Sequence, residues 1–181
     1  MIMNFFKENK KIVIISLVII IGFICNSIAH HYHMKNFKIR IEQEYQEAIH
    51  LLDQDFVSEE DAKKAHELLF IHGYHLDDKD EQAVVDSYKD GYYMLVYARA
   101  WTDFHGRYLR TKYEQYDSAV GVIGNIPDDY NGVLAQRVKF TKRFMIVERD
   151  SAKAVIDEVN AAEKEEMEKR KNNYYKTHKT K

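Results

Sequence analysis

Hydrophobic and polar positions divide the chain into one uniformly apolar run and a longer region with helical periodicity. Residues 12–29 carry no charged side chain. As a helix that rises about 1.5 Å per residue, this run covers about 27 Å, close to the thickness of the hydrocarbon core of a bilayer. The run therefore predicts a transmembrane helix. The residues expected to face lipid include Ile12, Ile15, Val18, Ile19, Ile21 and Phe23.

Basic residues flank the apolar run evenly. Three precede it (Lys7, Lys10 and Lys11) and three follow it (Lys35, Lys38 and Arg40). Because the count is balanced, the orientation depends on position, and a short basic stretch ahead of a first hydrophobic segment usually stays inside the cell. We therefore expect residues 1–11 to be a cytoplasmic leader, residues 12–29 a transmembrane signal-anchor and the remaining chain extracytoplasmic.

A cleaved signal peptide is the alternative for the same segment. Ser27 and Ala29 are small residues at the two positions that a signal-peptide cleavage site requires. The anchor is favoured because the run reaches spanning length, whereas the apolar part of a signal peptide is usually shorter. Both interpretations export residues 30–181, and the absence of cysteine from that region suits an oxidising compartment.

Beyond residue 30 the apolar residues recur at helical spacing. One stripe is expected in a helix over residues 34–56, formed by Met34, Phe37, Ile41, Tyr45, Ala48, Leu52 and Phe56. Ser58, followed by three acidic residues, predicts an N-cap with a favourable acidic first turn. The helix that follows should run to Ile71 and stop at Gly73.

Three further helices complete the expected architecture. A long central helix is predicted over residues 81–108, since it is apolar on two sides, and a shorter one over 113–126. Pro127 ends the latter because proline cannot continue a helix. The last helix should start near Asp129 and become a charged, fraying tail over residues 161–181.

The pattern predicts an all-α fold, with residues 30–160 as stacked antiparallel helical hairpins behind the membrane helix. Ala65 with Leu69, and Ala119 with Ile123, place a small residue one turn before a large one, which lets two helices approach closely. In this respect residues 45–145 resemble degenerate tetratricopeptide repeats. The resemblance implies a module that binds peptides or proteins.

Composition excludes several classes of function. The 181 residues include 27 basic and 29 acidic side chains, for a net charge of −2. This balance provides no basic footprint for nucleic acid. The single cysteine, Cys25, allows neither an intrachain disulfide nor a site with several thiolates.

No catalytic or cofactor motif stands out. His66-Glu67 begins like the zinc-peptidase motif H-E-x-x-H, but Phe70 occupies the position of the second histidine ligand. We therefore expect no metal and no cofactor. A metal-dependent hydrolase that uses His66, His72 and His75 is kept as a second alternative.

Aromatic residues give the most specific functional expectation. Tyrosine and tryptophan combine apolar area with a polar group, which suits binding surfaces. We expect Tyr92, Tyr97, Arg99 and Trp101 to line a groove for an extended peptide. The sequence thus indicates a non-catalytic, single-pass interaction module at the cell membrane, whose partner is an unidentified protein or peptide. The first alternative is a secreted binding or immunity-type protein.

Overall fold

The computed structural model of the chain describes residues 10–106 and 111–178, and it is all-helical, as predicted from the sequence. No strand occurs within those two ranges. The elements in chain order are α2 (Lys10–Leu52), α3 (Glu59–Leu69), the 3-10 helix η1 (Phe70–Gly73), α4 (Lys79–Ser87), α5 (Gly91–His105), α6 (Lys112–Ile123) and α7 (Ala135–His178).

The chain is organised as two compact units. The first contains Met1–Glu44 and His75–Tyr88, and the second contains Tyr45–Tyr74 and Lys89–Lys181. The boundaries expected at residues 29 and 160, where the sequence changes from apolar to polar, remain predictions. Helix α2 passes residue 29 without interruption.

The first unit combines the N-terminal part of α2 with α4. Its buried apolar residues are Phe37 and Ile41 on α2 and Val85 on α4. Asp78 is the N-cap of α4, and its carboxylate accepts hydrogen bonds from the backbone N–H groups of Asp80 and Glu81 at 2.8 and 3.1 Å. The role of Asp78 as this N-cap is a finding of the structure.

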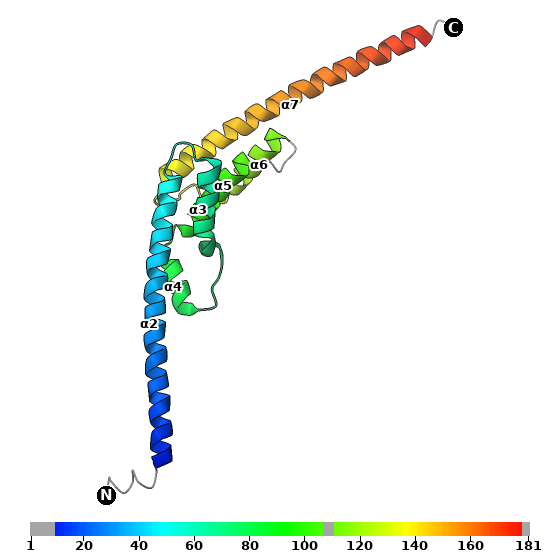
Figure 1. Cartoon of the computed structure of the whole chain (residues 1–181). Coiled ribbons are helices and arrows are strands. Elements are labelled where there is room, and N and C mark those ends of the chain that lie inside the picture. The colour runs from blue at the N-terminus through cyan, green and yellow to red at the C-terminus, as the bar shows by residue number, and fades with distance from the viewer. Residues whose placement is uncertain (1–9, 107–110, 179–181) are drawn as a thin grey trace. The chain divides into compact units, whose positions relative to one another are not determined.

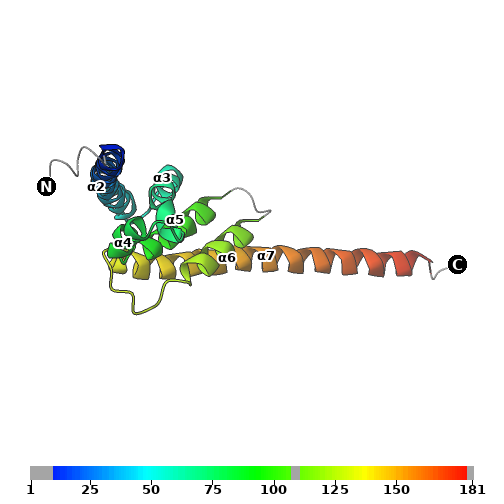
Figure 2. The ribbon, with the colours of Figure 1, turned by 90° about the horizontal axis from the view of Figure 1, so that it is seen from below.

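The second unit is built from helices that pack in chain order. Helix α5 packs against α3 on one side and α6 on the other (Figure 1), and α6 lies along the first part of α7 (Figure 2). Both pairs of a small and a large residue identified in the sequence are buried in this unit: Ala65 with Leu69, and Ala119 with Ile123. The centre is occupied by Trp101, which is completely buried.

Two helix starts of the second unit also carry side-chain N-caps. Ser58 accepts a hydrogen bond from the backbone N–H of Asp61 at 3.1 Å, which confirms the cap predicted for α3. At α6, Thr111 and Glu114 form a reciprocal capping box in which each side chain accepts from the other's backbone N–H, at 3.2 and 3.0 Å. Such caps satisfy backbone donors that a helix start leaves unpaired.

The single long helix expected over residues 81–108 is wrong. The segment forms α4 and α5, separated by Tyr88–Asp90. Gly91 begins α5 directly against the imidazole of His72, where a side chain would clash. Periodicity alone could not indicate this break, because both helices present apolar residues at helical spacing.

Other expected helix boundaries also shift. Helix α2 ends at Leu52, so Phe56 lies in the following loop. Helix α7 starts at Ala135 rather than near Asp129, because residues 127–130 form a turn in which the Tyr130 N–H donates to the Pro127 carbonyl at 3.2 Å. At its other end α7 continues to His178 instead of fraying after residue 161. Its charged residues are good helix formers, and several form ion pairs one turn apart.

Candidate interaction surface

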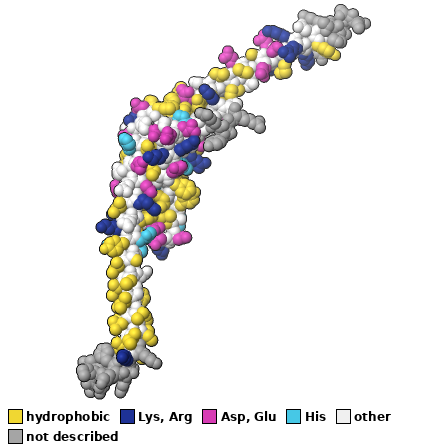
Figure 3. Space-filling model, viewed as in Figure 1, with side chains coloured by type: hydrophobic (Ala, Val, Ile, Leu, Met, Phe, Trp, Pro, Cys, Tyr) yellow, Lys and Arg dark blue, Asp and Glu magenta, His cyan; other side chains and the backbone are white. Residues whose placement is uncertain are grey.

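The apolar run forms the exposed N-terminal part of α2. The helix is long and apolar enough to cross a membrane, and none of its most apolar stretch is buried by protein. The six side chains expected to face lipid are all at least half exposed, from 53% for Ile19 to 73% for Phe23. Figure 3 shows this stretch as an almost continuous apolar surface.

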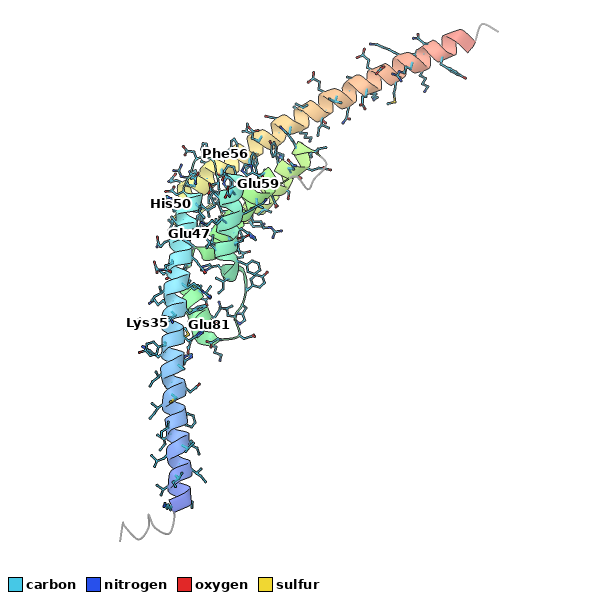
Figure 4. All side chains as sticks on the ribbon, viewed as in Figure 1. Lys35, Glu47, His50, Phe56, Glu59 and Glu81 are labelled. Atoms are coloured by element: carbon cyan, nitrogen blue, oxygen red, sulfur yellow. The ribbon has the colours of Figure 1, made fainter. Side chains whose placement is uncertain are left out.

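Two histidines that follow the apolar run connect α2 to the start of α4. His30 Nε2 lies 3.1 Å from a carboxylate oxygen of Asp80, and His33 Nε2 lies 2.6 Å from one of Glu81. Figure 4 labels Glu81 on α4, beside the part of α2 that carries Lys35. The pKa of the Asp78 carboxyl is lowered, mainly by the two backbone N–H groups that it accepts and further by the nearby histidines. We call His30, His33, Asp80 and Glu81 the polar layer, which follows the apolar segment immediately.

A cluster of aromatic rings occupies the second unit around Trp101. The ring of Phe56 meets the indole edge-on at a centroid distance of 5.0 Å, and Phe104 lies 5.5 Å from it. Phe104 in turn stacks on Tyr116 at 4.5 Å. His105 stacks on the indole and its Nε2 lies 2.7 Å from the Val57 carbonyl, which fixes the loop that carries Phe56. Edge-on and offset contacts of this kind stabilise an aromatic core.

Part of this cluster faces solvent. We define the aromatic patch as the rings of Phe56, Phe140 and Phe144 together with Val147, which follows Phe144 one turn later on α7. The exposed fractions are 53% for Phe56, 55% for Phe140 and 60% for Val147, while Phe144 is half-buried. The last three follow one another at helical spacing on α7. Phe144 lies 6.2 Å from Phe56 and 6.5 Å from Phe140, so the rings form one continuous surface.

The residues expected to line a peptide groove do not share a surface. Tyr97 and Trp101 are completely buried. The Tyr97 hydroxyl instead forms a buried hydrogen bond of 2.9 Å with Thr141 Oγ1, and burial raises the pKa of this phenol. Tyr92 and Arg99 are exposed, one α-helical heptad apart on α5. Two of the four residues are therefore accessible, and peptide binding by them remains a prediction.

The three histidines of the hydrolase alternative have separate environments. His72 is half-buried, with its ring 6.1 Å from that of Tyr45, and burial lowers its pKa. His66 is also half-buried and contacts Phe70 by an edge-on ring contact at 6.4 Å. His75 is exposed and belongs to the first unit. Among the residues that the structure describes, no three His, Cys, Asp or Glu side chains are grouped to hold a metal ion.

Charged side chains close the turn before α7. Lys142 donates to the Ile126 carbonyl at 2.5 Å and to the Asp128 carboxylate at 2.7 Å, which lowers the pKa of Asp128. Arg137 pairs with Asp53 at 2.7 Å and also with Asp55. The sequence indicated neither these ion pairs nor the exposure of Phe56 at a surface, because the partners lie far away along the chain.

Comparison with known protein families, with curated proteins and with solved structures finds no match to this chain.

Proposed function

We propose that this protein is a non-catalytic interaction module anchored in a membrane by residues 12–29, with its helical hairpins on the extracytoplasmic side. The observation that carries the proposal is that no part of the apolar stretch of α2 is buried by protein. The aromatic patch then serves as the surface that meets an apolar segment of a protein partner. The proposal does not require a cofactor.

The apolar stretch of α2 presents a large hydrophobic surface that no other part of the described chain covers. Eleven large apolar side chains between Ile12 and Ile28 are more than half exposed. Burying one such side chain is worth about 1.5–3 kcal/mol. Because each is already about half covered by its own helix, leaving all eleven in water forfeits roughly 8–17 kcal/mol. This amount is comparable to the entire free energy of unfolding of a typical domain, about 5–15 kcal/mol. A bilayer supplies cover of the required thickness.

The polar layer supports the same placement. His30 and His33, which hold the α4 carboxylates, follow the apolar run directly. Groups of this kind are stable at the level of lipid headgroups but expensive in hydrocarbon. Ser27 and Ala29, the small residues of the alternative cleavage site, lie inside α2. Cleavage there would require the helix to unwind, and this supports an anchor that is retained.

The interaction role is supported by the construction of the second unit. Both buried pairs of a small and a large residue lie on helices, α3 and α6, that each pack against α5. Stacked helical hairpins of the tetratricopeptide type commonly bind extended or helical peptides. The exposed rings of the aromatic patch provide rigid contact area of the kind that dominates protein interfaces.

Two measurements on cells that produce the chain test the anchor. We expect the protein to stay in the membrane fraction after alkaline carbonate extraction, and external protease to remove the C-terminal region from intact cells. N-terminal sequencing should find residues 1–29 still present. A soluble mature chain that begins at residue 30 would favour the secreted alternative, and protection from protease until lysis would contradict the orientation.

The binding role requires a separate test. A photoreactive phenylalanine analogue placed at Phe140 should crosslink a defined partner in the native membrane, and the same analogue at Tyr92 serves as a comparison on α5. Crosslinks from Tyr92 alone would show that the partner binds at α5, where Tyr92 and Arg99 were expected to line a groove, and not at the aromatic patch. The absence of crosslinks from both positions would contradict the interaction role of these surfaces.

A further inference from the structure

Helix α7 extends well beyond the last side chain that it buries. Its buried residues include Val138, Thr141 and Met145. Between Ile146 and Tyr174, the part of the remaining helix whose side chains are described, no residue is buried. Figure 2 shows this portion continuing past the end of α6.

The apolar seam of α7 nevertheless continues along this exposed portion. Val138 and Met145 are followed at intervals of seven by Ala152 and Val159. A repeat of seven keeps these positions on one side of the helix, the arrangement that pairs helices in coiled coils. Val159 is 51% exposed, and further along the helix Met167 is 65% and Tyr174 is 59% exposed. The next positions of this repeat are Glu166 and Asn173, so beyond Val159 the apolar line shifts by one residue to Met167 and Tyr174, which are themselves seven residues apart.

Charges around the seam are segregated along the helix. Acidic residues dominate the stretch 157–168, which contains Asp157, Glu158, Glu163, Glu165, Glu166 and Glu168 and a single lysine. The stretch 169–174 contains Lys169, Arg170 and Lys171 and no acidic residue. A second helix of the same sequence complements this pattern only when it runs in the opposite direction, since a parallel copy would place acid against acid.

Two charges beside Met167 are suited to such a partner. Lys169 pairs with Glu165 at 2.5 Å and Arg170 with Glu166 at 2.6 Å, each within α7. Glu163 and Lys171 form no ion pair with any residue in the described part of the chain. They lie four residues before and four residues after Met167 on one side of the helix.

We propose that the exposed part of α7 binds a second copy of this chain as an antiparallel helix pair centred on Met167. In this register the two Met167 side chains meet, and Glu163 of each copy faces Lys171 of the other. Val159 lies opposite the turn that holds Tyr174 of the other copy. The pairing covers the apolar seam with a partner whose charge order is matched to it, and it does not depend on the proposed function.

Disulfide trapping in the full-length chain, purified in detergent, tests the orientation. Cys25→Ser removes the native thiol, and Met167→Cys and Val159→Cys are then introduced singly. We expect Met167→Cys to form a disulfide-linked dimer under mild oxidation. Val159→Cys should not, because eight residues from the centre at about 1.5 Å each place the two thiols about 24 Å apart. Crosslinking at Val159→Cys would indicate a parallel pair and overturn the proposal.

Charge reversal provides an independent readout of the same pairing. Light scattering of the full-length chain should show a dimer that Glu163→Lys or Lys171→Glu weakens by about three- to ten-fold in dissociation constant, and that the double reversal restores. Both sites are exposed, so an unchanged circular dichroism spectrum shows that the variants are folded. A monomer at all concentrations, or a dimer that is indifferent to both reversals, would overturn the proposal.

Discussion

The carboxylate of Asp90 accepts a hydrogen bond of 2.7 Å from the backbone N–H of Val133. The first residue immediately precedes α5 and the second lies just before α7, so this bond connects the starts of two helices that are far apart in sequence. The Asp90 carboxylate also lies beside the Tyr130 hydroxyl. Burial and the negative charge of Asp90 together raise the pKa of Tyr130.

Loss of this bond should destabilise the second unit. We expect Asp90→Ala to lower the free energy of unfolding by about 1–3 kcal/mol, the usual cost of removing a hydrogen bond to a charged group. Chemical denaturation of the full-length chain in detergent, followed by circular dichroism, measures the effect. Asp129→Asn, at an exposed position nearby, is the control and should change stability by less than about 0.5 kcal/mol.

The buried bond between Tyr97 and Thr141 predicts a coupled pair of effects. Tyr97→Phe and Thr141→Val each leave one buried hydroxyl without its partner, so each should cost about 1–2 kcal/mol of unfolding free energy. The double variant leaves no hydroxyl behind and should cost less than the sum of the two. Strict additivity in this double-mutant cycle would show that the two hydroxyls do not interact in solution.

Glycine substitutions should have opposite effects at two positions. A Cβ at Gly91 would collide with the imidazole of His72, whereas a Cβ at Gly121 meets no atom within 4 Å. We expect Gly91→Ala to lower the melting temperature markedly. Gly121→Ala should raise it slightly, since alanine in a helix interior is favoured over glycine by about 0.5–1 kcal/mol. Equal tolerance at both positions would contradict the close packing of Gly91 on His72.

Burial of His72 predicts acid sensitivity. Its pKa in the folded chain lies below the ordinary value, because burial disfavours the charged imidazolium. As pH falls below about 6.5, the unfolded chain binds this proton before the folded chain does. The stability contributed by the depressed pKa is therefore present above that pH and is lost during acidification. His72→Gln should reduce the loss of stability between pH 7.5 and 5.5, whereas His50→Gln, at an exposed position, should not.

Local features of the fold were predictable because their causes are local. Ser58 precedes a run of acidic residues and caps α3 as expected. Helix α6 ends before Pro127 as expected, although its last residue is Ile123 rather than residue 126. The break at Asp90 was not predictable, because the backbone N–H that donates to the Asp90 carboxylate belongs to Val133, 43 residues away. The same limit applies to the candidate surface. The aromatic composition indicated a binding role, but only packing separates the exposed Phe56 from the buried Trp101.

The apolar part of α2 leads into the turn that carries His30 and His33 without a break in the helix. With residues 12–29 in lipid, the depth of that helix also sets the height of the bonded α4 terminus above the hydrocarbon. The thickness of the bilayer should therefore affect how well the anchored chain fits its membrane. A mismatch of a few ångströms must be met by tilting, by local thinning of the lipid or by immersing the polar layer, at a cost of fractions of a kcal/mol per ångström. Membranes of different thickness should therefore retain this chain to different degrees.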